Sequence, residues 1–286
     1  MNLTKNDILI ILPLSALIII GMIMVTSSSI YVADDMASNP FHFAQRQIFF
    51  IAIGLLLMAA FLILPSNFLY KTDWIFMLLS ILLLTALFIP ELGTSVNGSI
   101  RWIRIGPINI QPSEMCKFSL ILYISGYSVR RMSEINSLRS FLKPLTLLFI
   151  ISILIMGQPD LGSTAIVCIL VVGILFYAGI SFFQLGLLII LIALLGYLAV
   201  TTSPMRLARV LAFTDPFASE VVLNAGWQLS NSLISIGQGG WLGVGLGNSF
   251  QKSFFLPEAH TDFIFAILVE ELGIIGGMIL ISLFII

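Results

Sequence analysis

Three titratable side chains lie within five residues of one another toward the carboxyl end of the chain, at Glu258, His260 and Asp262. An apolar segment follows, and Thr261 predicts the start of a helix there, because a threonine hydroxyl can accept a backbone N–H bond at a helix N-terminus. Asp262 would then lie in the first helical turn, where the helix dipole stabilises a carboxylate. A capping role is the simple explanation for Asp262, whereas three titratable groups so close together favour a site for acid–base chemistry.

The same apolar segment carries two consecutive carboxylates, Glu270 and Glu271, beyond Asp262. Carboxylates within a membrane-spanning helix are costly, so they are kept either for function or in contact with a buried partner. The sequence leaves both explanations open. Gly273 and Gly277 have the G-x-x-x-G spacing typical of a face that packs against another helix.

A second candidate group is Glu114 with Lys117, which follow Ser113 in the stretch 111–117. Ser113 predicts a capped helix that begins at Glu114. Residues three apart lie on the same face of a helix, so the two charges can form an ion pair. Such a pair either anchors the helix end or lines the same outer cavity as Asp262.

Four further charges lie in loops. Asp160 belongs to the stretch 158–162, which predicts a tight turn between two helices, and turn formation alone could explain an aspartate after a proline. Arg101, Arg104 and Lys252 lie in segments rich in glycine and proline. Cations in such loops could bind an anionic ligand.

Other patterns indicate less chemistry. The glycines in 237–247 match neither the dinucleotide-binding nor the P-loop spacing, so close packing explains them better. His42 and His260 are too few for a histidine-based metal site, although carboxylates could still hold a cation. Cys116 and Cys168 lie in apolar stretches and predict small buried thiols rather than a disulfide. The net charge of −1 gives no general attraction to nucleic acid.

The chain that must position these groups has the composition of a membrane protein. Of its 286 residues, 59% are hydrophobic and 9% charged, with a mean hydropathy of +1.10, whereas soluble domains carry about 25% charged residues. A spanning helix needs about 20 mostly apolar residues. Clear spans are expected at 8–26, 48–64, 74–89, 163–178, 183–200 and 263–285, and weaker spans at 115–129 and 144–156. The predicted fold class is therefore all-α: a polytopic transmembrane bundle of about eight helices in a single domain, 1–286.

The distribution of lysine and arginine predicts a cytoplasmic N-terminus. The loop 130–143 carries four cations and one acid, which is typical of the cytoplasmic side. The first apolar run lacks a cleavage site and predicts an uncleaved helix. The long segments 91–113 and 201–260 would then lie outside, where their cations weigh little in the orientation rule. The first predicts a short hairpin or an extended turn around 102–110, and the second contains an amphipathic stretch at 227–236.

Several short motifs together resemble those of the SEDS family, whose members include FtsW, RodA and SpoVE. The matching stretches cover nearly the whole chain and are 43–47, 95–103, 111–114, 158–162, 245–249 and 256–273. Within the family, 96–98 and 257–260 are more similar to FtsW than to RodA. Members of this family have about ten spanning helices, whereas this chain ends within or just after the eighth expected span. The resemblance therefore implies a truncated sequence that lacks the C-terminal helices.

The resemblance implies a peptidoglycan glycosyltransferase that acts at the outer face of the bacterial cytoplasmic (inner) membrane during septum formation. Its substrate would be lipid II, with undecaprenyl pyrophosphate as the leaving group and inversion at the anomeric carbon. The family's essential aspartate falls on Asp262, the candidate general base, and its glutamate–lysine pair falls on Glu114 and Lys117. The residues expected to bind substrate are Arg101, Arg104, Glu114, Lys117, Asp160, Lys252, Glu258 and His260.

The resemblance also implies partners and a cofactor. The expected partners are a class B penicillin-binding protein transpeptidase, divisome regulators and membrane lipid, with no nucleic acid. A divalent cation, Mg or Mn, could share the diphosphate with Asp262 through ligands that the sequence does not identify, and no organic cofactor is expected. Two alternatives stay open: a flippase that moves lipid II outward, which Glu270 and Glu271 would support best, and a non-catalytic divisome scaffold.

Overall fold

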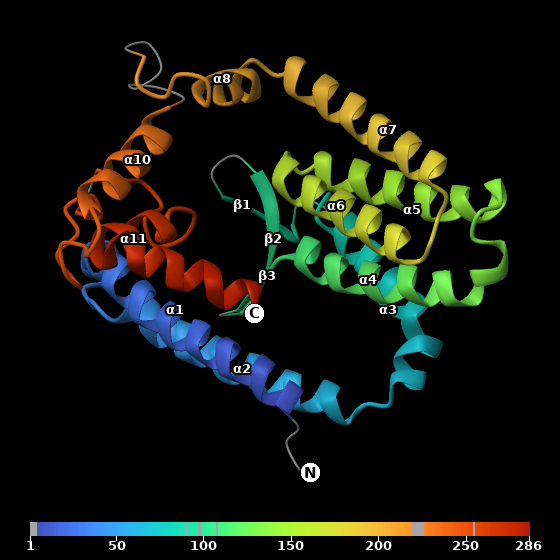
Figure 1. The fold of residues 1–286 in the computed structure, drawn as a ribbon, viewed down its shortest axis with the longest axis horizontal. Helices are drawn as coiled ribbons and strands as arrows, with labels where there is room; N and C mark the ends of the chain where they lie inside the picture. Colours follow the sequence, from blue (N-terminus) through green and yellow to red (C-terminus); the bar gives the residue numbers. More distant parts are fainter. Residues whose placement is uncertain (1–4, 90, 97–98, 107, 219–225, 254) are drawn as a thin grey trace. The chain divides into compact units, whose positions relative to one another are not determined.

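The computed structural model describes residues 5–89, 91–96, 99–106, 108–218, 226–253 and 255–286 (Figure 1). Within these ranges the chain is mainly helical, as predicted. It divides into two compact units: a terminal unit of Met1–Ala60 with Val200–Ile286, and a central unit of Phe61–Ala199. The eight predicted helices are all present, as α1 (Lys5–Ala37), α2 (His42–Ile63), α3 (Ser66–Ala86), α4 (Pro112–Arg130), α5 (Leu138–Met156), α6 (Leu161–Tyr177), α7 (Phe182–Thr201) and α11 (Ile264–Ile285).

Six of these helices are long and apolar enough to cross a membrane: Asp7–Met36, His42–Ile63, Ser66–Ala86, Leu138–Met156, Phe182–Thr201 and Ile264–Ile285. Helix α1 extends well beyond residue 26, where its span was predicted to end. The hydroxyl of Thr26 donates to the Met22 carbonyl and that of Ser28 to the Met24 carbonyl. Hydroxyl groups that bond back to the preceding turn let polar residues continue a helix in an apolar segment.

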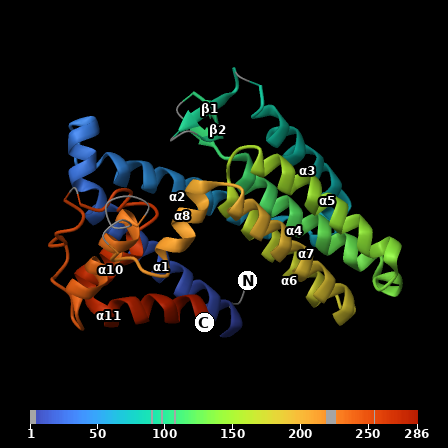
Figure 2. The same cartoon turned by 90° about the horizontal axis from the view of Figure 1, so that it is seen from above.

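The central unit has a continuous apolar core between its helices. Helix α4 packs against α3 and α6, and α5 packs against α6; Figure 2 shows these helices running side by side. The core contains apolar side chains contributed by every one of these helices, among them Leu84, Leu120, Ile124, Ile151, Ile155, Val167 and Val171. Burial of these faces fixes the ends of α4 and α6, where two of the predicted charged groups lie.

A small antiparallel sheet leads into α4. Its strands are β1 (Gly93–Val96), β2 (Ser99–Ile105) and β3 (Ile108–Ile110), in the order β1-β2-β3. Ile103 pairs with Ile110 and Arg104 with Asn109, so the hairpin predicted from the alternation around 102–110 is confirmed. Residues 97 and 98 of the family motif lie outside the described residues.

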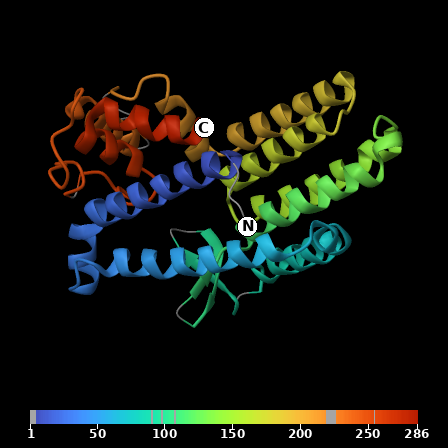
Figure 3. The ribbon, with the colours of Figure 1, turned by 60° about the horizontal axis from the view of Figure 1, so that its bottom comes forward.

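The terminal unit is built around α11. Helix α1 packs against α11, as does α10 (Trp227–Gly239), and α2 turns back after α1 (Figure 3). Buried residues from α1, α11 and the loop before α11 form a second apolar core: Met24, Leu256, Ala259, Ala266, Ile267, Leu268 and Val269. The amphipathic stretch at 227–236 is confirmed as α10, whereas α8 (Pro204–Ala212) was not predicted, because its nine residues are too short to span a membrane.

Helix α11 differs from the predicted continuous span. At Gly273 the backbone leaves helical geometry, with φ 72° and ψ −179°. This combination is open essentially to glycine alone. Gly273 therefore marks a break in the helix, and the close approach that it permits is to the backbone of Trp241 and Gly243 after α10.

Candidate functional site

The segment immediately before α11 carries the predicted catalytic group. Residues 257–263 form successive turns in which the amides of Thr261 and Phe263 each donate to the Glu258 carbonyl over 3.2 Å. The Thr261 hydroxyl donates to the Glu258 carboxylate over 2.8 Å, so Thr261 does not cap the helix. Because α11 begins at Ile264, Asp262 precedes the helix instead of occupying its first turn.

Buried neighbours hold this segment while its carboxylates remain in contact with solvent. Leu256 and Ala259 are buried against α11, whereas Glu258 and Asp262 are exposed. Burial of apolar side chains on both sides of a turn restricts the backbone between them. The structure therefore presents Asp262 as an accessible carboxylate at the end of a spanning helix.

His260 is half-buried between these two acids. Its ring lies against that of Phe43, with 4.7 Å between the ring centroids, and its Nδ1 is buried without a hydrogen-bond partner among the described residues. Burial lowers the pKa of His260, and the charges of Glu258 and Asp262 only partly oppose that effect. A neutral imidazole can donate or accept a hydrogen bond, but it offers no positive charge to a diphosphate.

The predicted ion pair on α4 is confirmed. Lys117 Nζ lies 2.7 Å from Glu114 Oε1, and the two side chains are 17% and 57% exposed. Helix α4 begins at Pro112, which suits the first helical turn because its ring fixes φ and its missing N–H would have no partner there. Ser113 is therefore a buried residue of the first turn and not the predicted cap.

Asp160 caps α6 and joins it to the sheet. Its carboxylate accepts bonds from the Ser163 amide at 3.0 Å and the Ser163 hydroxyl at 2.8 Å. Arg101 Nε lies 3.7 Å from the same carboxylate, and Arg101 Nη2 donates to the Pro159 carbonyl over 2.7 Å. The predicted turn at 158–162 is thus confirmed, and most of the hydrogen-bonding capacity of Asp160 is used within the protein.

The remaining two predicted cations differ sharply. Arg104 is exposed, and its Nε donates only a long bond of 3.5 Å to the Gly106 carbonyl. Lys252 was expected to face an anionic ligand, but its side chain is 2% exposed and its Nζ lies 2.6 Å from Glu271 Oε1. The structure corrects that expectation, because the charge of Lys252 is already matched by a buried carboxylate.

Glu270 and Glu271 are buried and bonded within the terminal unit. Each is 1% exposed, Glu270 accepting from a set of hydroxyl and amide donors and Glu271 from Lys252 and Ser27. The sequence left these partners open. Serines in the apolar stretch around Ser27 indicate that a polar contact is buried there. No spacing rule, however, predicts that this contact is with α11.

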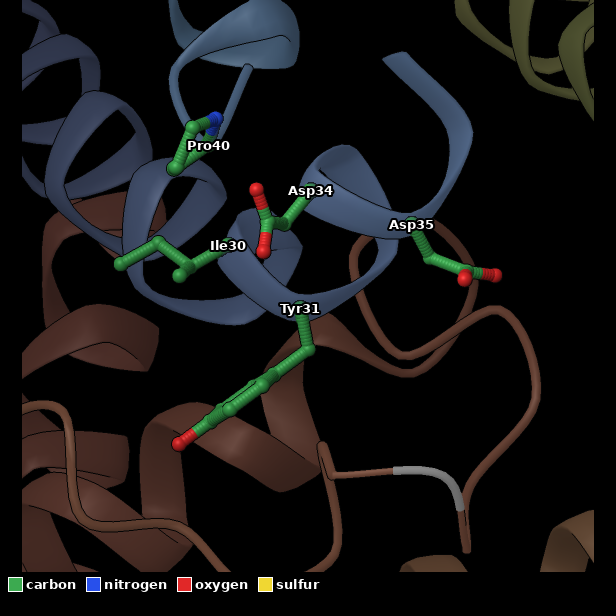
Figure 4. A pocket seen from close by; sticks show the side chains of 5 residues that line it. All are labelled: Ile30, Tyr31, Asp34, Asp35 and Pro40. Carbon is green, nitrogen blue, oxygen red and sulfur yellow. The ribbon is translucent and has the colours of Figure 1, made fainter. Parts of the chain in front are cut away.

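A pocket of about 430 Å³ at the end of α1 was also not predicted. It is lined by Ile30, Tyr31, Asp34, Asp35 and Pro40. Figure 4 shows the Asp34 side chain lying between Ile30 and Pro40, whereas the Asp35 carboxylate points away from it. Among the residues that the structure describes, no three His, Cys, Asp or Glu side chains gather as a metal site, so no metal ligands are assigned here or near Asp262.

The apolar spanning helices define a polytopic membrane protein, and within the terminal unit the exposed Asp262 before α11 is a candidate site at a helix end. A family model for cell cycle proteins of the FtsW, RodA and SpoVE type matches residues 7–286. The chain belongs to this family, so the resemblance to the SEDS proteins is confirmed.

Curated relatives are similar over almost the whole chain. A "Probable peptidoglycan glycosyltransferase FtsW" of Legionella pneumophila is 43% identical over 270 residues, which cover 94% of this chain and 68% of the relative. One from Alkalilimnicola ehrlichii is 41% identical, with 96% and 68% covered. One from Allochromatium vinosum is 44% identical, with 94% and 67% covered.

Solved structures share the fold. A chain described under "Structural coordination of polymerization and crosslinking by a peptidoglycan synthase complex" has a TM-score of 0.71 at 23% identity, with 96% of this chain and 74% of that chain covered. The rod shape determining protein RodA of Thermus thermophilus has a TM-score of 0.63 at 22% identity, with 97% and 71% covered. The predicted all-α membrane fold is confirmed by this likeness and by the helices themselves.

Proposed function

We propose that this protein is a peptidoglycan glycosyltransferase that polymerises lipid II at the outer face of the bacterial cytoplasmic membrane during septum formation, with Asp262 as the general base. The names of the curated relatives support the reaction class. The observation that carries the assignment of Asp262 is its accessible carboxylate on a segment that buried neighbours hold against α11.

The proposed reaction transfers a glycosyl group from one lipid-linked sugar to another. Asp262 takes the proton of the acceptor hydroxyl. At the same time the oxygen of that hydroxyl forms a bond to the anomeric carbon of the donor. The bond from that carbon to the diphosphate breaks, and undecaprenyl pyrophosphate leaves with the electron pair. The carbon is attacked opposite the leaving group, so its configuration inverts. Such a base is worth about 10²–10⁴-fold in rate.

Positive charge for the departing diphosphate is proposed to come from Arg104 and Lys117. Arg104 is exposed, and Lys117 is held by Glu114 at one end while part of its side chain stays accessible. A cation that stabilises developing charge on a leaving group lowers the barrier. Arg101 and Asp160 are proposed to shape the same region by joining β2 to α6. That Glu114 and Lys117 line one cavity with Asp262 stays a prediction.

The remaining parts of the proposal concern orientation, partners and cofactor. The cations of the loop 130–143 support a cytoplasmic N-terminus. The solved assembly described as a peptidoglycan synthase complex supports a penicillin-binding protein as partner, and divisome regulators are proposed from the family. We propose that a divalent cation enters the site bound to the diphosphate of the substrate. Polymerisation should then be lost in EDTA and recovered when Mn²⁺ or Mg²⁺ is added.

Transport of lipid II is the main alternative, and one observation weighs against it. Carboxylates within spanning helices often mark a transport path. Glu270 and Glu271, however, accept hydrogen bonds from donors within the terminal unit. A non-catalytic scaffold would tolerate replacement of Asp262, which the enzyme would not.

The decisive experiment compares Asp262→Asn with Asp215→Asn in the full-length protein, using purified lipid II and gel analysis of the glycan product. Asp215 is an exposed acid of the same long segment, so the two variants make the same chemical change. We expect Asp262→Asn to lower the polymerisation rate by about 10²–10⁴-fold and Asp215→Asn to leave it unchanged. Near-normal polymer from Asp262→Asn would remove Asp262 from the role of base.

A further inference from the structure

Two buried carboxylates and one buried ammonium group in the terminal unit take no part in the proposed reaction. Glu270 and Glu271 are each 1% exposed, and Lys252 is 3% exposed. Burial of three ionisable groups costs several kcal/mol for each unpaired charge. Buried groups of this kind need defined partners, and the partners of each carboxylate indicate its role.

Glu270 gathers the loop that follows α10. Its Oε1 accepts from the Phe250 amide at 2.8 Å and from the Gln251 amide at 3.4 Å. Its Oε2 accepts from the Ser249 hydroxyl at 2.7 Å and from the Ser235 hydroxyl of α10. An ionised carboxylate is an acceptor only, and all four partners are donors. One side chain of α11 therefore fixes both α10 and residues 249–251.

Glu271 performs the same task on the next stretch of the loop. It accepts from Lys252 Nζ at 2.6 Å and from the Ser27 hydroxyl of α1 at 2.8 Å, while Lys252 Nζ also lies 3.0 Å from the Ser27 oxygen. The triangle of Lys252, Glu271 and Ser27 joins α1, α11 and the loop. Charged hydrogen bonds in a low dielectric are strong and directional.

The backbone of α11 opens at the same place. Beyond the break at Gly273, the amides of Ile274 and Ile275 donate to the carbonyls of Gly240 and Trp241, at 2.9 and 3.4 Å. The loop after α10 is therefore bonded to the α11 backbone at the break.

Two carbonyls on the N-terminal side of the break also bind the loop. The Glu270 carbonyl accepts from the Val244 amide at 2.9 Å, and the Glu271 carbonyl accepts from the Gly245 amide at 3.0 Å. The two backbones approach so closely that a Cβ on Gly243 would meet the Glu271 carbonyl. The same two glutamates thus bind the loop through both backbone and side chain.

We propose that Glu270 and Glu271, with Lys252 as counter-ion, are positioning residues: a carboxylate clamp that seats the loop 240–252 in the break of α11 and thereby sets the position of Asp262. The inference rests on the proposed function. The clamp reaches the catalytic segment through Gln251, whose carbonyl accepts from the Leu256 amide at 3.0 Å. Beyond Asp262 the chain re-enters α11, so both ends of the segment are fixed to one helix.

The experiment separates positioning from stability by removing the ion pair without leaving a buried charge. The double variant Lys252→Met with Glu271→Leu replaces two charges by apolar side chains, a change that is often neutral for stability. The control is Arg130→Met with Asp73→Leu in the central unit, where Arg130 Nη1 lies 2.7 Å from Asp73 Oδ2. Both double variants are made in the full-length protein, and thermal unfolding in detergent identifies folded preparations.

Two measurements then follow on the folded proteins. Hydrogen exchange of the amides at 249–253 without substrate reports whether the loop has been released. Polymerisation of purified lipid II gives kcat and KM. We expect the Lys252–Glu271 double variant to exchange faster at 249–253 and to lose about 10²-fold in kcat, because a displacement of about 1 Å at a reacting group has that effect. The Arg130–Asp73 control should keep the wild-type values of both.

Two results would overturn the inference. One is a folded double variant at Lys252 and Glu271 that polymerises at the wild-type rate; the other is unchanged exchange at 249–253 when Glu270→Leu removes the acceptor of four bonds. Glu270→Gln keeps one acceptor oxygen and should restore part of kcat, which a purely structural loss would not show. If wild-type protein itself makes no polymer, the proposed function fails, while the exchange measurements still decide whether the clamp exists.

Discussion

Two lysine–glutamate pairs in the described part of the chain have nearly the same N–O distance and opposite surroundings. The N–O distance is 2.6 Å in Lys252–Glu271 and 2.7 Å in Lys117–Glu114, but the first pair is 2% and 0% exposed and the second 17% and 57%. In the buried pair each charge needs the other, because bulk solvent reaches neither side chain. In the exposed pair water can replace either partner, so Lys117 can turn to a ligand at little cost. A short distance alone therefore does not identify a binding cation.

Replacement of the lysine in each pair should give the largest difference in stability. Lys252→Met leaves the Glu271 carboxylate buried with the Ser27 hydroxyl alone, and we expect it to lower the free energy of unfolding by about 3–5 kcal/mol. Lys117→Met removes a partly solvated pair and should cost about 0–1 kcal/mol. Denaturant unfolding of both variants in the same detergent measures the difference. Equal losses would mean that burial does not distinguish the two pairs.

The same contrast separates what the sequence could predict from what it could not. The pair on α4 follows from spacing, because residues three apart meet on any helix. Lys252 and Glu271 are 19 positions apart, and Ser27 is 244 positions from Glu271. No local rule relates such residues, so the sequence alone predicts that Lys252 is a cation that faces a ligand. Their contact depends on how α1, α10 and α11 pack.

Most of the fold was predictable for a comparable physical reason. A helix in a bilayer must be apolar along its whole length, which makes each span readable without its neighbours. The hairpin before α4 likewise showed in its alternation. The break in α11 was not predictable, because hydropathy treats 263–285 as one run and Gly273 fits a packing motif equally well. The short helix α8 was not predicted, because nine residues are too few to be recognised as a membrane span.

The close approach between the backbones of α11 and the loop after α10 can be tested at Gly273. Gly273→Ala must place a side chain at φ 72° and ψ −179°, where its Cβ would meet the Trp241 carbonyl. We expect a loss of about 1–3 kcal/mol in stability, together with release of the loop at 240–245 in hydrogen exchange. Gly186→Ala in α7 meets nothing within 4 Å and should instead stabilise the helix by about 0.5–1 kcal/mol. A stabilised Gly273→Ala would show that α11 is continuous.

The smallest expected effect concerns His260, whose degree of burial is intermediate between those of the two ion pairs. Burial lowers the pKa of this imidazole below its ordinary value of 6.5, and the charges of Glu258 and Asp262 only partly raise it. Between the lowered pKa and 6.5 the unfolded chain binds more protons than the folded protein, so stability falls as the pH falls through this window. Above pH 6.5, His260 should add nothing to the pH dependence of stability.

The measurement is the difference between wild type and His260→Phe in unfolding free energy from pH 7.5 downwards, which cancels the titration of the other acids. Phenylalanine keeps the contact with the Phe43 ring and removes the titrating group, so the variant should lose less stability than wild type as the pH falls below about 6.5. His42→Phe is the matched control for packing, because His42 also lies against Phe43, with 5.5 Å between ring centroids. If His260→Phe follows the wild-type curve at every pH, His260 is as solvated in the folded protein as in the unfolded chain, and it would then have to be grouped with the exposed pair on α4.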